Sequence, residues 1–204
     1  MKFPQGVNIY ALSDSGFDHL GYFKQLLAGG VDIIQLRDKH MHDRDFYKLA
    51  LKLRKLVKRY KKIFIINDRL HISQAVDADG IHLGENDLPI SVARKILGKR
   101  KIIGYSAHNF SSAFNAWREG ADYISVGPMF KSPTKKYLEP IPVTEIQLIT
   151  QRIRLPLVAI GGINLRNIIS VRNLGFRNVA LISGLKRARN KKEFITKVRM
   201  ILEK

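Results

Sequence analysis

The stretch 32-DIIQLRDKHMHDRDFYKLALKLRKLVKRYKKIFIINDR-69 contains one strand-helix-strand unit. Its ends, 32–36 and 63–66, are short runs rich in β-branched residues, which are typical of buried strands. Between them, apolar residues recur at three- and four-residue intervals among lysines and arginines, and this pattern predicts an amphipathic helix with one buried face. That face comprises Phe46, Leu49, Leu53, Leu56, Val57 and Tyr60. The unit favours a parallel sheet with a crossover helix.

The same unit repeats along the chain. Eight strand candidates alternate with helical stretches, at 9–12, 32–36, 63–66, 80–83, 101–105, 123–126, 157–160 and 178–182. Glycines stand where four helices are expected to stop, at Gly30, Gly98, Gly120 and Gly175. A doubly wound sheet would carry a GxGxxG turn after its first strand, where this chain has Ser13-Asp14-Ser15. We therefore predict an α/β fold, a single (β/α)8 TIM-barrel domain over residues 1–204.

Composition restricts the class of protein. The apolar share of 45% is enough for one core, and no uncharged run is long enough to cross a bilayer. The chain has no cysteine and its amino terminus lacks the apolar stretch of a secretory signal, so we expect a cytoplasmic protein. A formal net charge of +19 favours anionic ligands. Because no nucleic-acid module accompanies this charge, we interpret it as a basic solvated surface rather than an RNA site.

Polar residues gather at seven of the eight predicted strand ends, where barrels carry their chemistry. After the second strand, Gln35, Arg37 and Lys39 alternate, so they can point to one side of an extended chain. A guanidinium binds phosphate oxygens in a bidentate fork and an ammonium adds a point charge. This strand end therefore suits an anionic ligand.

Carboxylates follow at the next two strand ends. Asn67 and Asp68 come after the third strand, and Asp87 comes after the fourth. Carboxylates would repel a phosphate directly, but Mg²⁺ takes one or two carboxylates together with phosphate oxygens and water. The alternative for either aspartate is a helix cap, which short acidic residues at strand-to-helix turns often provide.

The last strand ends suit a second phosphate. The long loop after the sixth strand carries Ser132, Thr134 and Lys135, whose hydroxyls and ammonium can close over phosphate oxygens. The seventh strand ends at Gly161-Gly162 and the eighth at Ile182-Ser183. Barrels most often build a phosphate site from backbone N–H groups at these two ends.

The histidines divide by position. Four fall in predicted loops or helix starts and are expected to be solvated, namely His19, His40, His42 and His71. An inward His82 is interpreted as a hydrogen-bonded structural residue. His108, close to Ser106 at the end of the fifth strand, is a candidate proton carrier.

Seven segments stand in order along nearly the whole chain. They are 35–39, 67–69, 79–84, 87–89, 104–108, 127–135 and 160–163. As a set they resemble the thiamine phosphate synthase family. The resemblance implies a transferase of thiamine biosynthesis in which an aminopyrimidine diphosphate loses pyrophosphate. The nitrogen of a thiazole phosphate then attacks the methylene carbocation.

The resemblance also implies the role of each site residue. The residues that contact the pyrimidine diphosphate would be Gln35, Arg37, Lys39, Asn67, Ser106 and Lys135. Asp68 and Asp87 would bind Mg²⁺. The residues that hold the thiazole phosphate would be Ser132, Thr134, Gly162, Ile182 and Ser183. Catalysis would depend on Ser106 and on the cations Arg37, Lys39 and Lys135, which neutralise charge on the leaving group.

The chain departs from the family pattern at three places. Glu85-Asn86 stands where the family usually has Gln-Glu, Ser132 replaces a threonine, and the segment 137–142 lacks the family's glycine. The last change lies in the loop expected to close over the substrate, so we expect it to affect the affinity for substrate.

Two other functions stay open. One is the related thiazole tautomerase, which binds a thiazole phosphate and moves protons, with His108 as the proton carrier. Retention of Asn67, Asp68, Asp87 and Lys135 argues against it, because a tautomerase has no leaving pyrophosphate that needs a metal site. The other is a non-catalytic barrel that binds an anion or RNA through its basic surface. The sequence also leaves a homo-oligomer open.

Overall fold

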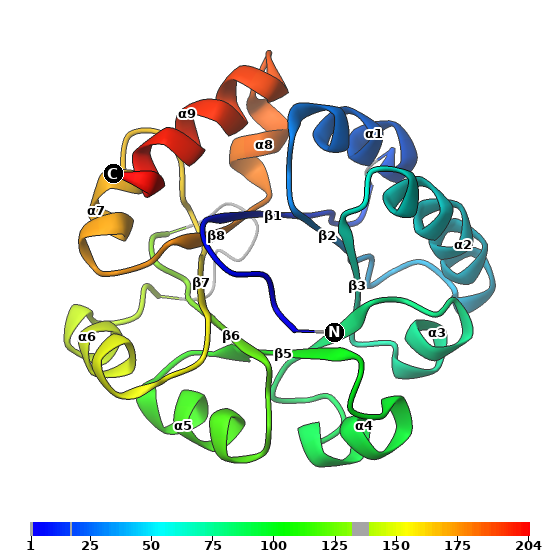
Figure 1. Cartoon of the computed structure of the whole chain (residues 1–204), viewed down its shortest axis with the longest axis horizontal. Helices are drawn as coiled ribbons and strands as arrows, with labels where there is room; N and C mark the ends of the chain where they lie inside the picture. Colours follow the sequence, from blue (N-terminus) through cyan, green and yellow to red (C-terminus); the bar gives the residue numbers. More distant parts are fainter. Residues whose placement is uncertain (1, 17, 132–138) are drawn as a thin grey trace.

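Eight parallel strands form a closed barrel in sequence order (Figure 1). The computed structural model describes residues 2–16, 18–131 and 139–204. The strands are β1 (Asn8–Leu12), β2 (Ile33–Leu36), β3 (Ile63–Asn67), β4 (Gly80–Leu83), β5 (Ile102–Ala107), β6 (Tyr123–Val126), β7 (Leu157–Ile160) and β8 (Asn178–Leu181). Each agrees with a predicted strand to within two residues at either end, so the predicted (β/α)8 fold is confirmed.

Helices form a ring around the barrel (Figure 1). They are α1 (His19–Gly29), α2 (Asp43–Arg59), α3 (Leu70–Ala75), α4 (Ile90–Leu97), α5 (Phe110–Arg118), α6 (Val143–Arg152), α7 (Ile168–Asn173), α8 (Ser183–Arg187) and α9 (Lys191–Glu203). The four glycines predicted at helix stops all have positive φ, from +75° to +97°. No helix in the described parts of the chain combines the length and apolarity needed to span a bilayer.

The predicted stripe on α2 is largely confirmed. Phe46, Leu53 and Val57 are buried against the sheet, together with Ala50, which the pattern did not single out. Tyr60 is 38% exposed, because α2 ends at Arg59 and the helical periodicity no longer applies to the next residue.

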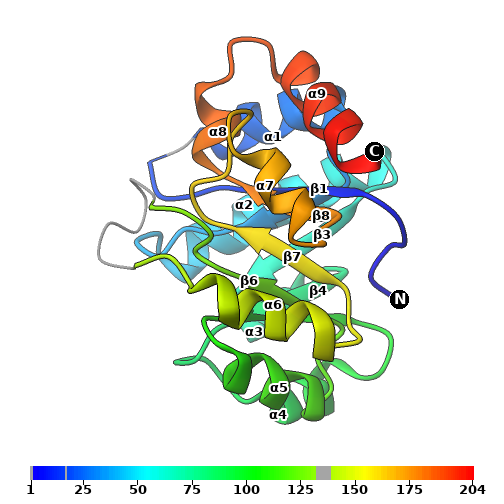
Figure 2. The ribbon, with the colours of Figure 1, turned by 90° about the vertical axis from the view of Figure 1, so that its left-hand side faces the viewer.

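The amino-terminal segment closes one end of the barrel. It runs across the ring of strands in Figure 1, and the Phe3 ring packs with its centroid 4.7 Å from that of Tyr123 inside the barrel. In Figure 2 this segment lies on the opposite side from α8, which follows the carboxyl end of β8. A ligand therefore has access from the carboxyl ends of the strands.

Three aspartates fasten the amino-terminal end of the barrel. Each stands immediately before an even-numbered strand, accepts the backbone N–H of a residue in the preceding strand, and meets an arginine from a helix. The sets are Asp32 with Ile9 and Arg199, Asp79 with Phe64 and Arg54, and Asp122 with Ile103 and Arg94, at 2.6 to 3.0 Å. Each aspartate thus joins two strands to a surrounding helix.

Asp32 makes the stability of the fold depend on pH. Burial alone would raise the pKa of its carboxyl, but the Ile9 N–H, Lys62 and Arg199 outweigh burial and hold the pKa below its ordinary value. A carboxyl with a lowered pKa stabilises the fold above its unfolded pKa of about 3.9. That contribution is lost as the pH falls through the folded value.

We expect Asp32→Asn to lower the unfolding free energy at pH 7 by about 1–3 kcal/mol. Its unfolding free energy should also fall less steeply than that of the parent below about pH 5. Urea denaturation at several pH values measures both. Asp45→Asn is the control, because the Asp45 side chain is 63% exposed and, among the residues that the structure describes, forms an ion pair with Lys48 alone. Equal pH slopes for the parent and Asp32→Asn would contradict the assignment.

Candidate active site

A pocket at the barrel mouth brings together side chains from distant strands. Five predicted site residues line it, namely Gln35, Arg37, Asn67, Ser106 and Ile182. Apolar groups of Leu12, Pro128 and Ile160 form part of the wall. An apolar wall with a few convergent polar groups suits a small-molecule ligand.

Two carboxyl groups lie next to each other beside this pocket. Asp68 follows β3 with a left-handed φ of +60°, and its carboxyl is within hydrogen-bonding reach of the Asp87 carboxyl. Burial and the charge of Asp87 raise the pKa of Asp68 to about 6, against the opposing charges of Lys39 and Arg37. The Lys39 ammonium lies 3.7 Å from Asp68 and is 60% exposed.

Neither aspartate caps a helix. The residues that precede α3 and α4 are Arg69 and Pro89, and neither helix receives a hydrogen bond from the capping side chain. Asp87 instead accepts the Gly84 N–H at 2.7 Å and closes the turn after β4. The helix-cap alternative is therefore wrong for both residues.

The carboxyl pair fits a hard divalent cation. Two neighbouring carboxylates repel each other, and a cation between them removes the repulsion. Within residues 2–16, 18–131 and 139–204, no three His, Cys, Asp or Glu side chains gather in a group able to hold a metal. The chain would thus supply two carboxylates, and Mg²⁺ commonly takes its other ligands from phosphate and water.

A second cavity lies between the ends of β7 and β8. Gly162, Ile182 and Ser183, for which the resemblance implies contact with the thiazole phosphate, line it together. Gly162 has a φ of +66°, and a Cβ there would come within 2.7 Å of the Lys131 carbonyl oxygen. Only glycine fits this turn without strain.

Basic side chains border this cavity. Lys131, Arg166 and Arg187 line the adjoining pocket together with Gly162 and Ser183. The motifs did not single out these three cations. A feature of the sequence that points to them is their position, four or five residues beyond a predicted strand end or glycine pair. A cavity lined by glycine and a helix start, with cations at its border, suits a phosphate group.

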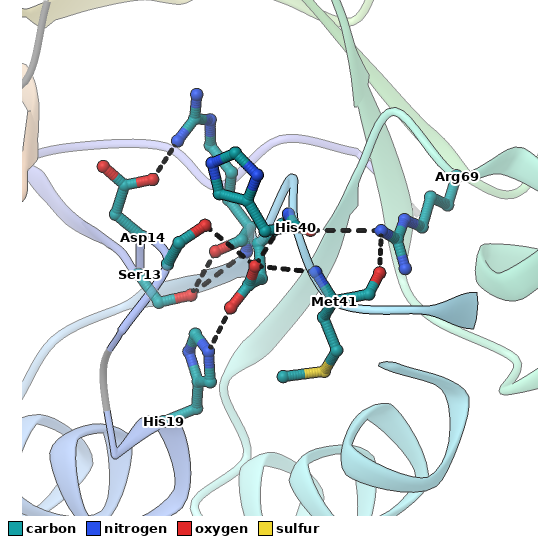
Figure 3. Close-up of polar contacts among 9 residues, drawn as sticks. Ser13, Asp14, His19, His40, Met41 and Arg69 are labelled. Carbon is teal, nitrogen blue, oxygen red and sulfur yellow. Dashed lines mark hydrogen bonds and ion pairs between the residues drawn. The ribbon is translucent and has the colours of Figure 1, made fainter. Parts of the chain in front are cut away.

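Asp38 organises the loop that carries Arg37 and Lys39. It is 7% exposed and accepts hydrogen bonds from Ser15 Oγ and His19 Nε2, at 2.8 and 3.1 Å. The backbone N–H groups of His40 and Met41 donate to it at 3.0 Å. In Figure 3 the His19 ring and the backbone of His40 and Met41 surround this carboxyl, whereas the Met41 side chain points away from it.

The position of His19 corrects a prediction. His19 was expected to be solvated, but it is 5% exposed, because it begins α1 directly beneath the loop and its ring reaches the buried Asp38 carboxyl. His40, His42 and His71 are exposed, as predicted. His82 is buried, is hydrogen-bonded on both ring nitrogens as expected, and lines the pocket.

An ion pair with Asp14 holds Arg37 in place. The Asp14 carboxyl contacts the Arg37 guanidinium, and Ser13 Oγ accepts the Arg37 backbone N–H at 3.1 Å (Figure 3). The sequence motifs omitted Asp14. It belongs to Ser13-Asp14-Ser15, the one strand end that was used only to exclude a GxGxxG turn.

Three predicted residues lie outside the described part of the chain. They are Ser132, Thr134 and Lys135. Their roles stay predictions, and His108, which borders the pocket and is exposed, stays a candidate.

Comparison with known proteins identifies the family. The model of the thiamine monophosphate synthase family matches residues 9–185. The chain belongs to this family. A thiamine-phosphate synthase from Fusobacterium nucleatum is 41% identical over 181 residues, which cover 87% of this chain and 88% of the relative. A second, from Prochlorococcus marinus subsp. pastoris, is 44% identical over 91% of this chain, and the chain spans about half of that relative's length (53%).

One solved structure agrees with this family membership, and a second shares the fold. A thiamine phosphate pyrophosphorylase from Pyrococcus furiosus superposes with a TM-score of 0.86 at 32% identity, over 97% of this chain and 96% of the other. A 3-hexulose-6-phosphate synthase from Salmonella typhimurium has a TM-score of 0.67 at 13% identity over 96% and 98% of the two chains, and it shares the fold alone.

Proposed function

We propose that this family member is a thiamine-phosphate synthase. It would join 4-amino-2-methyl-5-hydroxymethylpyrimidine diphosphate to a thiazole phosphate and release pyrophosphate. The observation that carries the proposal is a pocket with Gln35, Arg37, Asn67 and Ser106 next to the Asp68–Asp87 pair. The names of its relatives support the same reaction.

The cations promote departure of the leaving group. The bond between the methylene carbon and the diphosphate oxygen breaks, and its electron pair leaves with pyrophosphate. Arg37, Lys39 and Lys135 neutralise the charge that develops there. The lone pair of the thiazole nitrogen forms the new carbon–nitrogen bond, so the attack needs no general base. Gln35, Asn67 and Ser106 orient the pyrimidine diphosphate.

Asp68 and Asp87 would hold Mg²⁺ beside the diphosphate. When bound, the ion adds positive charge at the phosphate oxygens. Lys39, 3.7 Å from Asp68, stands where an ammonium can contact the same anion. The two carboxylates would thus bind the diphosphate by way of the metal ion, whereas without the ion they would repel the diphosphate.

The thiazole phosphate would bind between β7 and β8. Gly162, Ile182 and Ser183 line that cavity. Backbone N–H groups would donate to the phosphate, with Ser132 and Thr134 as further donors. The neighbouring Lys131, Arg166 and Arg187 add the positive charge that such an anion favours.

Gly162→Ala tests the thiazole phosphate site. The new Cβ must displace the backbone near Lys131, so we expect KM for thiazole phosphate to rise by about tenfold or more, with KM for the pyrimidine diphosphate little changed. Initial rates at varied concentrations of each substrate measure both. Gly6→Ala is the control, because Gly6 also has a positive φ but a Cβ there meets nothing within 4 Å. Equal effects on both KM values would refute the assignment.

The function itself is tested with purified protein, the two substrates and Mg²⁺. Magnesium-dependent formation of thiamine phosphate and pyrophosphate in equal amounts is the expected result. No product from folded protein would refute the synthase, and isomer exchange in a thiazole phosphate carboxylate, lost in His108→Ala, would then establish the tautomerase. Salt-sensitive RNA binding without turnover would favour the non-catalytic barrel.

We also propose that the protein acts as a single domain on small molecules. The strands of the closed barrel run from residue 8 to residue 181, which supports a single domain. Its partners would be small-molecule substrates of the cytoplasm.

A further inference from the structure

A chain of hydrogen bonds crosses the barrel interior beneath the pocket. Gln35 Nε2 donates to the Tyr10 hydroxyl at 2.8 Å, and the Tyr10 and Tyr123 hydroxyls lie 2.8 Å apart. The Tyr123 hydroxyl is 2.8 Å from His82 Nδ1, and His82 Nε2 is 2.9 Å from Ser106 Oγ. Gln35 and Ser106, the two ends, line the pocket, whereas Tyr10 and Tyr123 lie below it.

The middle of this chain is held rigidly. Tyr10 is 2% exposed and Tyr123 is fully buried. The Tyr123 ring occupies space left by Gly104, where a Cβ would come 2.0 Å from the ring. It also stacks on His82, with centroids 5.5 Å apart. Burial raises the pKa of both phenols, so each keeps its proton and has one hydrogen bond to donate.

Each phenol has a single proton, so all hydrogen bonds in this series donate in the same direction. Because Gln35 donates to Tyr10, the Tyr10 proton points to Tyr123, and the Tyr123 proton points to His82 Nδ1. A neutral imidazole that accepts at Nδ1 carries its proton on Nε2 and donates it to Ser106 Oγ. The Ser106 proton is then directed away from His82.

The two ends of the chain therefore have opposite hydrogen-bonding character. The buried Gln35 Oε1 has no hydrogen-bond partner among the described residues. An unpaired buried acceptor favours a ligand that donates to it. Ser106 has a hydroxyl proton left to donate. In the reverse direction Gln35 would offer its NH₂ group, and the Ser106 proton would be consumed by His82.

We propose that Tyr10, Tyr123 and His82 are positioning residues that fix this direction, so that Gln35 presents an acceptor and Ser106 a donor to the substrate. The inference rests on the proposed function and deepens it. It selects a ligand with one donor and one acceptor at these two places. An aminopyrimidine diphosphate provides both, since its exocyclic amine donates and its ring nitrogens and phosphate oxygens accept.

The protonated nitrogen of His82 is the first measurement, and it does not depend on turnover. In ¹⁵N NMR of the parent, the His82 ring is expected to show a bare Nδ1 and a protonated Nε2, with His82→Gln used only to assign the resonance. Tyr123→Phe removes the donor to Nδ1 and is expected to produce a mixture of tautomers. A parent with protonated Nδ1, as the other tautomer or as imidazolium, would overturn the proposal even if the enzyme is active.

Tyr10→Phe gives the functional readout, because it interrupts the series of hydrogen bonds at a residue that does not line the pocket. The Gln35 amide loses its partner, so we expect about a tenfold weaker binding of the pyrimidine diphosphate, measured by calorimetry, with KM for thiazole phosphate unchanged. Ile65→Val is the control for packing in the same interior cluster. Unchanged binding in Tyr10→Phe, or an equal loss in Ile65→Val, would contradict the positioning role. Inactive parent protein would instead count against the proposed function.

Discussion

Asp68→Asn is expected to lower magnesium-dependent turnover by about 10³-fold. The variant keeps the shape of the side chain but leaves one carboxylate, on Asp87, to hold the ion. Asparagine is the right replacement because Asp68 has a φ of +60°, a conformation that asparagine also adopts readily. Alanine would add backbone strain to the loss of charge and would obscure the cause.

The same variant is expected to be more stable than the parent when no metal is present. Burial and Asp87 raise the pKa of Asp68 to about 6, so its contribution to stability is most favourable at low pH and is lost as the pH rises through that value. Removing the charge should therefore raise the unfolding free energy at pH 8 by about 1–2 kcal/mol. Activity and stability thus move in opposite directions.

Thermal unfolding with and without Mg²⁺ provides a readout separate from turnover. The ion should raise the Tm of the parent and leave that of Asp68→Asn nearly unchanged, because only the parent has both carboxylates. Glu85→Gln is the matched control, since it removes an exposed carboxylate from the loop that carries Asp87. The metal site would be refuted if Mg²⁺ did not change the Tm of the parent, or if Asp68→Asn kept full turnover.

The sequence predicts the barrel well because the repeated pattern is strong. Each strand is a short β-branched run between amphipathic stretches, so strand bounds such as 80–83 and 123–126 agree with the structure. Once the barrel is accepted, its carboxyl ends must meet at one mouth. This is why Gln35, Asn67 and Ser106, which are far apart in the chain, could be expected at one place, and they line one pocket.

Lys39 shows where strand periodicity stops being a guide. It was expected on the same side as Gln35 and Arg37, but β2 ends at Leu36, and beyond that residue the alternation of an extended chain no longer applies. Lys39 is 60% exposed and lies beside Asp68, and it does not line the pocket. The Lys39 side chain thus extends from the loop after β2 to Asp68, at the end of the neighbouring strand β3.

Contacts between the loops at the barrel mouth could not be predicted from the sequence. Asp14 and Asp38 lie in the turns that follow β1 and β2, and His19 begins α1; polar residues at such places are usually solvated. Their contacts with one another depend on how the turn after β1 folds over the turn after β2, which no periodicity encodes. The link between Tyr10 and Tyr123 was missed for a similar reason, because it requires the side chains of β1 and β6 to meet across the barrel.

Asp38→Ala is expected to reduce kcat/KM by about 100-fold, because Arg37 and Lys39 lose their defined positions. Asp38 accepts four hydrogen bonds, two from the backbone N–H groups that shape this loop. Removing the carboxyl leaves these donors unpaired and should lower the unfolding free energy by about 3 kcal/mol. Steady-state kinetics and urea denaturation measure the two effects.

The loss of activity in Asp38→Ala must be separated from its loss of stability. Asp79→Ala provides that comparison, since Asp79 and Asp38 are both 7% exposed and both accept a backbone N–H. Asp79 lies at the amino-terminal end of the barrel, so its removal should destabilise the fold by a similar amount and leave kcat/KM nearly intact below the unfolding temperature. Parallel losses of activity in both variants would mean that Asp38 acts only through stability. A loss confined to Asp38→Ala would show that a residue buried behind the loop positions the cations of the active site.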